Sequence, residues 1–120
     1  MIRAYLLYTG TDGHSHVTRG SISGGAHTAA ESIRFKETPA HSSLDWHNAP
    51  VEQYVITLSG VLAFDTHSGE KFILEPGDVL VATDTTGSGH TWRLINDDPW
   101  KRAYVIFREG TATGFVADPV

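Results

Sequence analysis

Short apolar runs, broken at regular intervals by turn residues, are the feature of this 120-residue chain that most limits its fold. The runs have the length of strands and are rich in Val, Ile, Thr and aromatic residues, which is typical of all-β sandwiches and barrels. They are Ile2–Tyr8, Ser32–Phe35, Val51–Leu58, Val61–Phe64, Phe72–Leu74, Val79–Ala82, Thr91–Ile95 and Ala103–Phe107. A helix needs a longer stretch of 3.6-residue periodicity, and only Ala26–Ile33 offers a turn or two of it. The pattern therefore predicts an all-β fold.

Length and charge exclude several classes of function. A chain of 120 residues has the size of one domain. Nine Lys and Arg against 14 Asp and Glu give a net charge of −5, which argues against binding of nucleic acid or of an anionic membrane surface. No apolar stretch approaches the length that spans a bilayer, and the N-terminus does not read as a signal peptide. The chain has no cysteine, and we expect a cytoplasmic protein.

Seven histidines are the main candidates for chemistry, and several have an unremarkable interpretation. His67 falls in a hairpin turn and is expected to be solvated. His14 and His16 are spaced to lie on one strand face, where they would chelate a metal, but their Gly- and Asp-rich surroundings favour an exposed loop. Whether this pair joins a site stays open at this point.

His47, Gln53 and His90 stand out because of their surroundings. His47 lies just before the run Val51–Leu58, and His90 is expected to point inward because it shares a strand face with Trp92 and Leu94. Gln53 shares a face with Val51 and Val55, and His90 begins a strand. A buried His or Gln must find a hydrogen-bond partner or a ligand. Two interpretations are about equally supported: a satisfied network of the three side chains, or a metal or small-molecule site.

The second half of the chain carries motifs of a known superfamily. Gly69–Val79 contains a Pro-Gly-Asp turn before an apolar strand, Gly87–His90 follows it, and Gln53–Gly60 matches the end of an earlier motif. On these residues the chain resembles the cupin superfamily, the small jelly-roll barrels of the RmlC-like type. The resemblance covers Ala40–Phe107. It implies a single cupin domain over residues 1–120, with N-terminal strands and loops in 1–39 and the core motif region in 40–108.

The first cupin motif usually reads H-x-H-x(3,4)-E-x6-G, in which both His and the Glu bind a metal. Six residues separate Gln53 from Gly60, so Gln53 stands at the Glu position. His47 matches the motif in two ways. It takes the first His position with Ala49 at the second, or the second position with Asp45 at the first.

The second motif usually reads G-x5-P-x-G-x2-H-x3-N. Gly87 and His90 match its G-x2-H, whereas Thr85 stands at the Pro position and Asn96 comes two residues late. The resemblance thus implies a divalent metal (Fe, Mn, Ni or Zn) held by His47, Gln53 and His90. Neutral Gln binds such an ion more weakly than a carboxylate would.

The loop Thr83–Gly89 lies beside His90 and contains Asp84. Asp84 is a candidate catalytic base, or a partner that orients His90. It also fits a plain turn in which Asp bonds its own backbone, and this reading is slightly favoured. A Gly-rich loop at a barrel mouth would also be able to close over a ligand.

Two classes of function follow. In the first, a small cupin protein binds a divalent metal and a small organic molecule, as a dioxygenase, isomerase or lyase. In the second, a metal-free cupin binds a small molecule, or isomerises it by acid–base chemistry with His47 and Asp84. The sequence leaves the choice of enzyme open.

A homodimer is also expected. If Gln53 points inward, then Tyr54, Ile56 and Leu58 point outward and would form an apolar patch rarely seen on monomers. The N-terminal run Ile2–Tyr8 would cover this patch from its own chain or from a partner. Small cupins commonly dimerise through such contacts, so the resemblance favours a partner.

Overall fold

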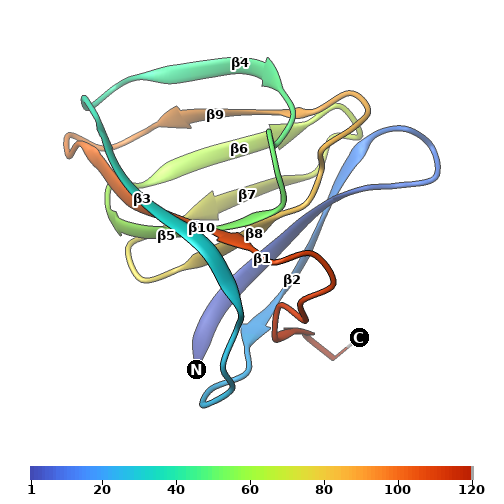
Figure 1. Cartoon of the computed structure of the whole chain (residues 1–120). Helices are drawn as coiled ribbons and strands as arrows, with labels where there is room; N and C mark the ends of the chain where they lie inside the picture. Colours follow the sequence, from blue (N-terminus) through green and yellow to red (C-terminus); the bar gives the residue numbers. More distant parts are fainter. Residues whose placement is uncertain (120) are drawn as a thin grey trace.

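The computed structural model describes residues 1–119, and these form eleven strands in two sheets (Figure 1). The strands are β1 (Ile2–Thr9), β2 (Ser15–Ile22), β3 (Ala30–Thr38), β4 (Ser43–His47), β5 (Gln53–Ser59), β6 (Leu62–Thr66), β7 (Lys71–Leu74), β8 (Val79–Ala82), β9 (His90–Leu94), β10 (Trp100–Phe107) and β11 (Phe115–Ala117). The predicted all-β fold is confirmed. The weak helical signal of Ala26–Ile33 produces no helix, and its last residues begin β3.

The two sheets face each other as a sandwich. The larger has the order β11-β2-β1-β8-β5-β10-β3, and the smaller has the order β4-β9-β6-β7. The N-terminal strand β1 pairs in parallel with β8 and antiparallel with β2, so it is part of its own chain's sheet. Among residues 1–119 no helix is able to cross a membrane.

The space between the sheets is filled at one end and hollow at the other. At the filled end, aromatic rings from β1, β6 and β7 stack: Phe72 lies 4.7 Å from Phe64 and 4.8 Å from Tyr5, measured between ring centroids. At the other end lie β3 and β4, the edge strands of different sheets, joined by a turn in which Ser42 donates to the Pro39 carbonyl. The hollow part of the space between the sheets therefore lies beside β3 and β4.

The outward face of β5 is covered within the chain. Tyr54 is buried with Phe107, and Phe115 of β11 packs against them. The Tyr54 hydroxyl also donates to the Thr113 carbonyl. Only Leu58, 56% exposed, is left from the patch that was expected to need a cover. The reason is that the C-terminal segment folds over this face, a contact that the strand pattern does not encode.

Candidate functional site

A cavity of about 320 Å³ lies between the sheets at the β3–β4 end. This volume suits a small organic molecule. Its wall is mostly apolar and aromatic, with polar and charged side chains added from both sheets. The lining residues are Arg34, Lys36, Leu44, His47, Asn48, Ala49, Pro50, Gln53, Val55, Phe64, Leu80, Ala82, His90, Trp92, Trp100, Arg102 and Tyr104.

His47 and His90 face each other across paired strands. They are register partners in the β4–β9 ladder, and their ring centroids lie 4.4 Å apart with an edge-on angle of 62°. Gly89 allows this approach: its φ is +76°, and a Cβ there would lie 2.3 Å from the His47 carbonyl oxygen. A side chain at position 89 would thus push the two imidazoles apart.

Asp84 lies behind His90, away from the cavity. Its Oδ2 accepts hydrogen bonds from His90 Nδ1 at 2.5 Å and from Ser15 Oγ at 2.6 Å. The side chain is fully buried and is not part of the cavity wall. Because an ionised carboxylate only accepts hydrogen bonds, His90 carries its proton on Nδ1, which leaves Nε2 as its remaining polar atom.

His47 is held in a similar way by its own strand. Its Nδ1 donates to the Asp45 carbonyl oxygen at 2.7 Å. Burial lowers the pKa of His47 below its ordinary value, and the nearby His90 lowers it further, against the opposing effects of the Asp45 carbonyl and Asp84. His47 is therefore neutral at pH 7, with an unprotonated Nε2.

Gln53 adds a neutral amide to the same wall. It is 5% exposed and begins β5 opposite Ala82 of β8. The hydrogen bonds of His47 and His90 go to Asp45 and Asp84, not to Gln53. The three cavity side chains thus do not satisfy one another, which leaves polar atoms available for a ligand.

The structure places Asp45 and Ala49, the two alternatives beside His47, differently. His47 and Ala49 both line the cavity, whereas Asp45 does not. The Asp45 carboxylate accepts from the Trp46 backbone N–H instead. A register shift in the β4–β9 ladder between Leu44 and His47 breaks the alternation that would have turned Asp45 inward. Of the two residues, only Ala49 therefore lies at the cavity.

These residues set limits on a metal. Among residues 1–119 no group of three or more His, Cys, Asp or Glu side chains is placed to hold one. The nitrogen donors left are the Nε2 atoms of His47 and His90, with the Gln53 amide oxygen as a third, neutral donor. This set fits an ion that prefers imidazole, held weakly and without charge neutralisation.

The loop Thr83–Gly89 is fixed rather than free. Its Thr86 carbonyl accepts from Thr9 Oγ1 and from Asn48 Nδ2, both at 2.9 Å. Its Ser88 N–H donates to the Gly13 carbonyl at 3.0 Å. These bonds to the β1–β2 turn and to the cavity wall favour a structural turn that fixes Asp84 beside His90.

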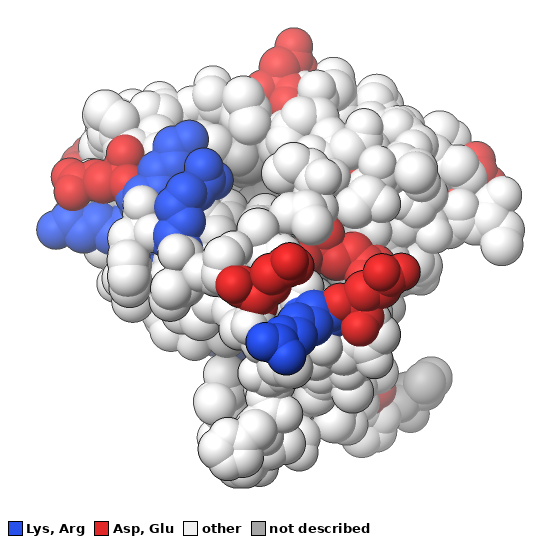
Figure 2. All heavy atoms as spheres, viewed as in Figure 1, with Lys and Arg blue, Asp and Glu red and all other residues white. Residues whose placement is uncertain are grey.

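Three cations lie on the cavity wall and were not singled out from the sequence. They are Arg34 and Lys36 on β3, and Arg102 on β10. Figure 2 shows Lys and Arg side chains gathered beside a hollow on the face that β3 crosses. The sequence does contain one indication for Arg102. Residues two apart in a strand share a face, so Arg102 lies between Trp100 and Tyr104 on the face that these aromatic residues turn inward.

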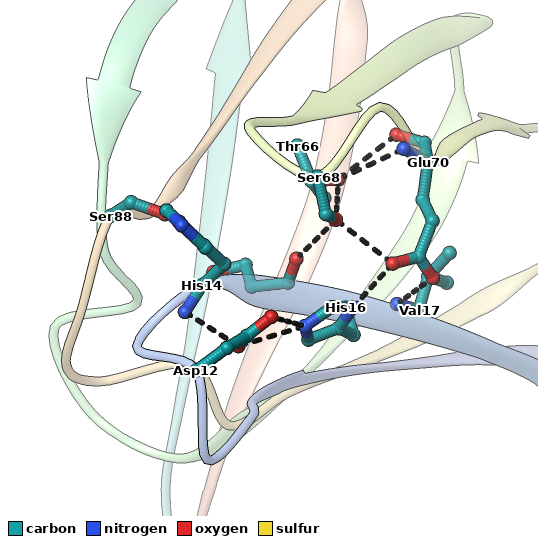
Figure 3. A network of polar contacts seen from close by, with 9 residues as sticks. Asp12, His14, His16, Val17, Thr66, Ser68, Glu70 and Ser88 are labelled. Atoms are coloured by element: carbon teal, nitrogen blue, oxygen red, sulfur yellow. Dashed lines mark hydrogen bonds and ion pairs between the residues drawn. The ribbon is translucent and has the colours of Figure 1, made fainter.

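A separate polar network joins the β1–β2 turn to the start of β7 (Figure 3). His16 Nε2 contacts Asp12 at 2.8 Å, and His16 Nδ1 contacts Glu70 at 2.5 Å. These two hydrogen bonds, first that of Glu70 and then that of Asp12, raise the pKa of His16 above its ordinary value. With both ring nitrogens engaged, His16 has no lone pair for a metal. It therefore acts as a clamp between two hairpins.

His14 and His67 also lie outside the cavity. His14 Nδ1 bonds Ser88 Oγ at 2.8 Å, while the His67 ring stacks on Trp46 at 3.4 Å between centroids. The predicted turn at His67 is present and His67 is exposed, as expected, with its ring stacked on that of Trp46. Neither histidine joins His47 and His90.

Comparison with known proteins assigns no family. No family model matches the chain, and no curated protein matches it significantly. The site must therefore be interpreted from its own chemistry.

Proposed function

We propose that this protein is a small cupin-type jelly roll that binds a small organic molecule between its sheets and transfers protons on it through His47 and His90. The observation that carries the proposal is the His90–Asp84 pair, a buried carboxylate bonded to an imidazole that opens onto a cavity of molecular size. Such a pair keeps the ring in one tautomer and stabilises the imidazolium when it forms.

The two histidines suit opposite roles. His47, kept neutral by its lowered pKa, accepts a proton from the bound molecule at Nε2. His90 in its protonated form, stabilised by Asp84, donates a proton to another atom of the same molecule. One proton leaves the substrate to His47 and one returns from His90, so the net reaction is an isomerisation. Solvent then takes the proton from His47 and returns one to His90, and no other co-reactant is needed. Asp84, which does not line the cavity, is a positioning residue in this proposal.

A metal-dependent function is the second candidate. One observation favours it: both imidazoles have Nδ1 bonded to an oxygen acceptor, which is how metal-binding histidines are usually oriented. His47, His90 and Gln53 would hold the ion. It would supply Lewis-acid polarisation of a substrate oxygen. Two observations argue against a metal: the three donors are neutral, and three cations lie on the cavity wall.

One binding experiment tests both candidates. Chelator-treated protein is titrated with a panel of small amides, alcohols and ketones, and the indole N–H signals of Trp92 and Trp100 are followed by NMR. We expect ligands to shift these cavity signals and to leave the exposed Trp46 unchanged. His47→Ala and His90→Ala should each weaken binding by about tenfold or more, whereas His14→Ala and His67→Ala should not.

The metal arm repeats the titration with Zn²⁺ or Mn²⁺ present and adds thermal unfolding. The acid–base proposal expects binding without metal and no metal-induced gain in stability. A rise in melting temperature with Zn²⁺ that disappears in His47→Ala and His90→Ala would instead establish the second candidate. Equal effects of all four His→Ala variants on binding would contradict both.

A further inference from the structure

The positive charge of the cavity is unusual for this chain. The protein as a whole carries −5, yet the wall holds Arg34, Lys36 and Arg102, and no Asp or Glu among the described residues lines it. The carboxylate nearest to the histidines, Asp84, is behind the wall and occupied by Ser15 and His90. The field inside the cavity is therefore opposite in sign to the charge of the whole molecule.

Arg102 is the least expected of the three. Its side chain is buried, with only 2% of the residue exposed. Its Nε donates to Tyr104 Oη at 3.0 Å, and its Nη1 to Thr38 Oγ1 at 2.6 Å and the Trp100 carbonyl at 3.0 Å. Nη2 takes part in none of these bonds. All three acceptors are neutral, so they hold the guanidinium in place without balancing its charge.

No anion in the described part of the chain balances this charge. The ion pairs of residues 1–119 are formed by Arg3, Lys71, Arg93 and three histidines, and none includes a cation of the cavity wall. Burying an unpaired charge is costly, and proteins normally pair it. Within residues 1–119, the buried guanidinium of Arg102 therefore has no ion-pair partner.

The guanidinium groups are also oriented by aromatic rings. The Arg102 Cζ lies 3.8 Å from the Trp100 ring centroid, and the Arg34 Cζ lies 4.8 Å from that of Tyr104. Stacking on the Tyr104 ring leaves the edge of the Arg34 guanidinium free to bind the two oxygens of a carboxylate, whereas Arg102 offers only Nη2. Beyond this basic end the wall is apolar, with Val55, Leu80 and Trp92.

We propose that the cavity takes a small organic carboxylate, with its anionic group between Arg34, Lys36 and Arg102 and its apolar body against the aromatic wall toward His47 and His90. This inference rests on the proposed function, because it names the substrate class of the same cavity. It adds that the molecule on which the histidines act is an anion.

Matched pairs of a carboxylate and its primary amide test the charge alone. The pairs are benzoate and benzamide, phenylacetate and phenylacetamide, and hexanoate and hexanamide, titrated under the same Trp92 and Trp100 readout. The carboxylate of a pair should bind at least about tenfold more tightly than the amide, because its hydrogen bonds are charge-assisted. Its affinity should also fall as salt is added.

The variant for this test is Arg34→Gln/Lys36→Gln, since both side chains are exposed at the cavity mouth and form no hydrogen bond or ion pair within residues 1–119. It should weaken carboxylate binding by about tenfold and leave amide binding unchanged. Lys101→Gln is the matched control, because Lys101 lies on β10 beside Arg102 but is exposed outside this cavity. Arg102 is left intact, as it holds Thr38 and Trp100.

The outcomes separate the two proposals. Amides that bind as tightly as carboxylates, or an equal effect of Lys101→Gln, would overturn the anion inference and leave the cavity's proposed function in place. Binding of inorganic phosphate as tight as that of the best carboxylate would overturn the assignment to an organic anion. The proposed function itself would be overturned if neither series binds at millimolar concentration and no compound of the wider panel binds either.

Discussion

At the scale of single residues, the site depends on a carboxylate that the ligand does not touch. Asp84 is fully buried, and both of its hydrogen bonds are made by Oδ2; Oδ1 has no hydrogen-bond partner in the described residues. A buried carboxylate oxygen without a partner costs stability, and such a cost is explained where the carboxylate fixes another group. The group it fixes is the His90 imidazole, whose tautomer decides whether the nitrogen that faces the cavity carries a proton.

Replacement of Asp84 tests this positioning role. In Asp84→Asn, the amide can present either its oxygen or its NH₂ to His90 Nδ1, so we expect the Nδ1–H tautomer to lose population. Nitrogen-detected NMR of His90 measures this directly. Affinity for the tightest ligand of the panel should fall about 10- to 100-fold.

Ser15→Ala is the matched control for this change. It removes the other hydrogen bond to Asp84 Oδ2 but retains the carboxylate. The His90 tautomer should therefore persist in Ser15→Ala. An unchanged tautomer and unchanged affinity in Asp84→Asn would show that Asp84 has no positioning role.

At the scale of elements, strands with a strong apolar run could be predicted and those without one could not. Val79–Ala82 is reproduced by β8, and the alternation in β5 correctly turns Gln53 and Val55 inward. The residues of β2 and β4 contain no strong apolar run, and their pairing with β1 and β9 makes them strands. The sequence pattern reflects local composition, while the structure depends on partners far along the chain.

The candidate site could also be predicted only in part. His47, Gln53 and His90 do line one cavity, as their positions in inward-facing strands indicated. Asp45 is turned away by the register shift in β4, which no local pattern reveals. Arg34 and Lys36 read as ordinary solvent-exposed charges, and only the placement of the edge strand β3 brings them to the cavity mouth.

The clamp at His16 makes a prediction about pH. Because its folded pKa is raised, the folded state binds more protons than the unfolded state, and stability falls as pH rises from the unfolded value near 6.5 through the folded value. Below about pH 6.5 the contribution is fully present. The difference in unfolding free energy between the wild type and His16→Gln should therefore shrink as the pH rises above about 6.5.

Urea denaturation across this pH range is the measurement. His47, with its lowered pKa, acts in the opposite direction: it costs stability as pH falls below about 6.5, but it is present in both proteins and cancels in the difference. His41→Gln is the control, since its contact with Asp97 is between exposed side chains. A difference independent of pH would mean that His16 is not charged in the fold.

At the scale of the whole molecule, the strands that bound the cavity also carry the apolar surface that the chain leaves uncovered. β3 is the edge strand of the larger sheet, and nearly all of its residues are exposed. Its inner face presents Arg34 and Lys36 to the cavity, while Ile33 and Phe35 are 58% and 70% exposed. An unpaired edge with exposed aromatic and β-branched side chains is a template for another strand.

We propose that the two-fold homodimer expected from the sequence forms at β3, and not through Tyr54 and Ile56 of β5, which the chain covers by itself. Phe35 and Leu58 border one shallow groove, so a second copy packed there would cover both and pair its own β3 edge with this one. The interface should bury more than about 1,000 Å² in total.

Light scattering at micromolar concentration should give the mass of a dimer. Phe35→Glu should give a monomer, while Val116→Glu, an equally polar change at the exposed β11 edge, should remain dimeric. A monomer mass for the wild type, or dissociation by Val116→Glu alone, would contradict this assembly.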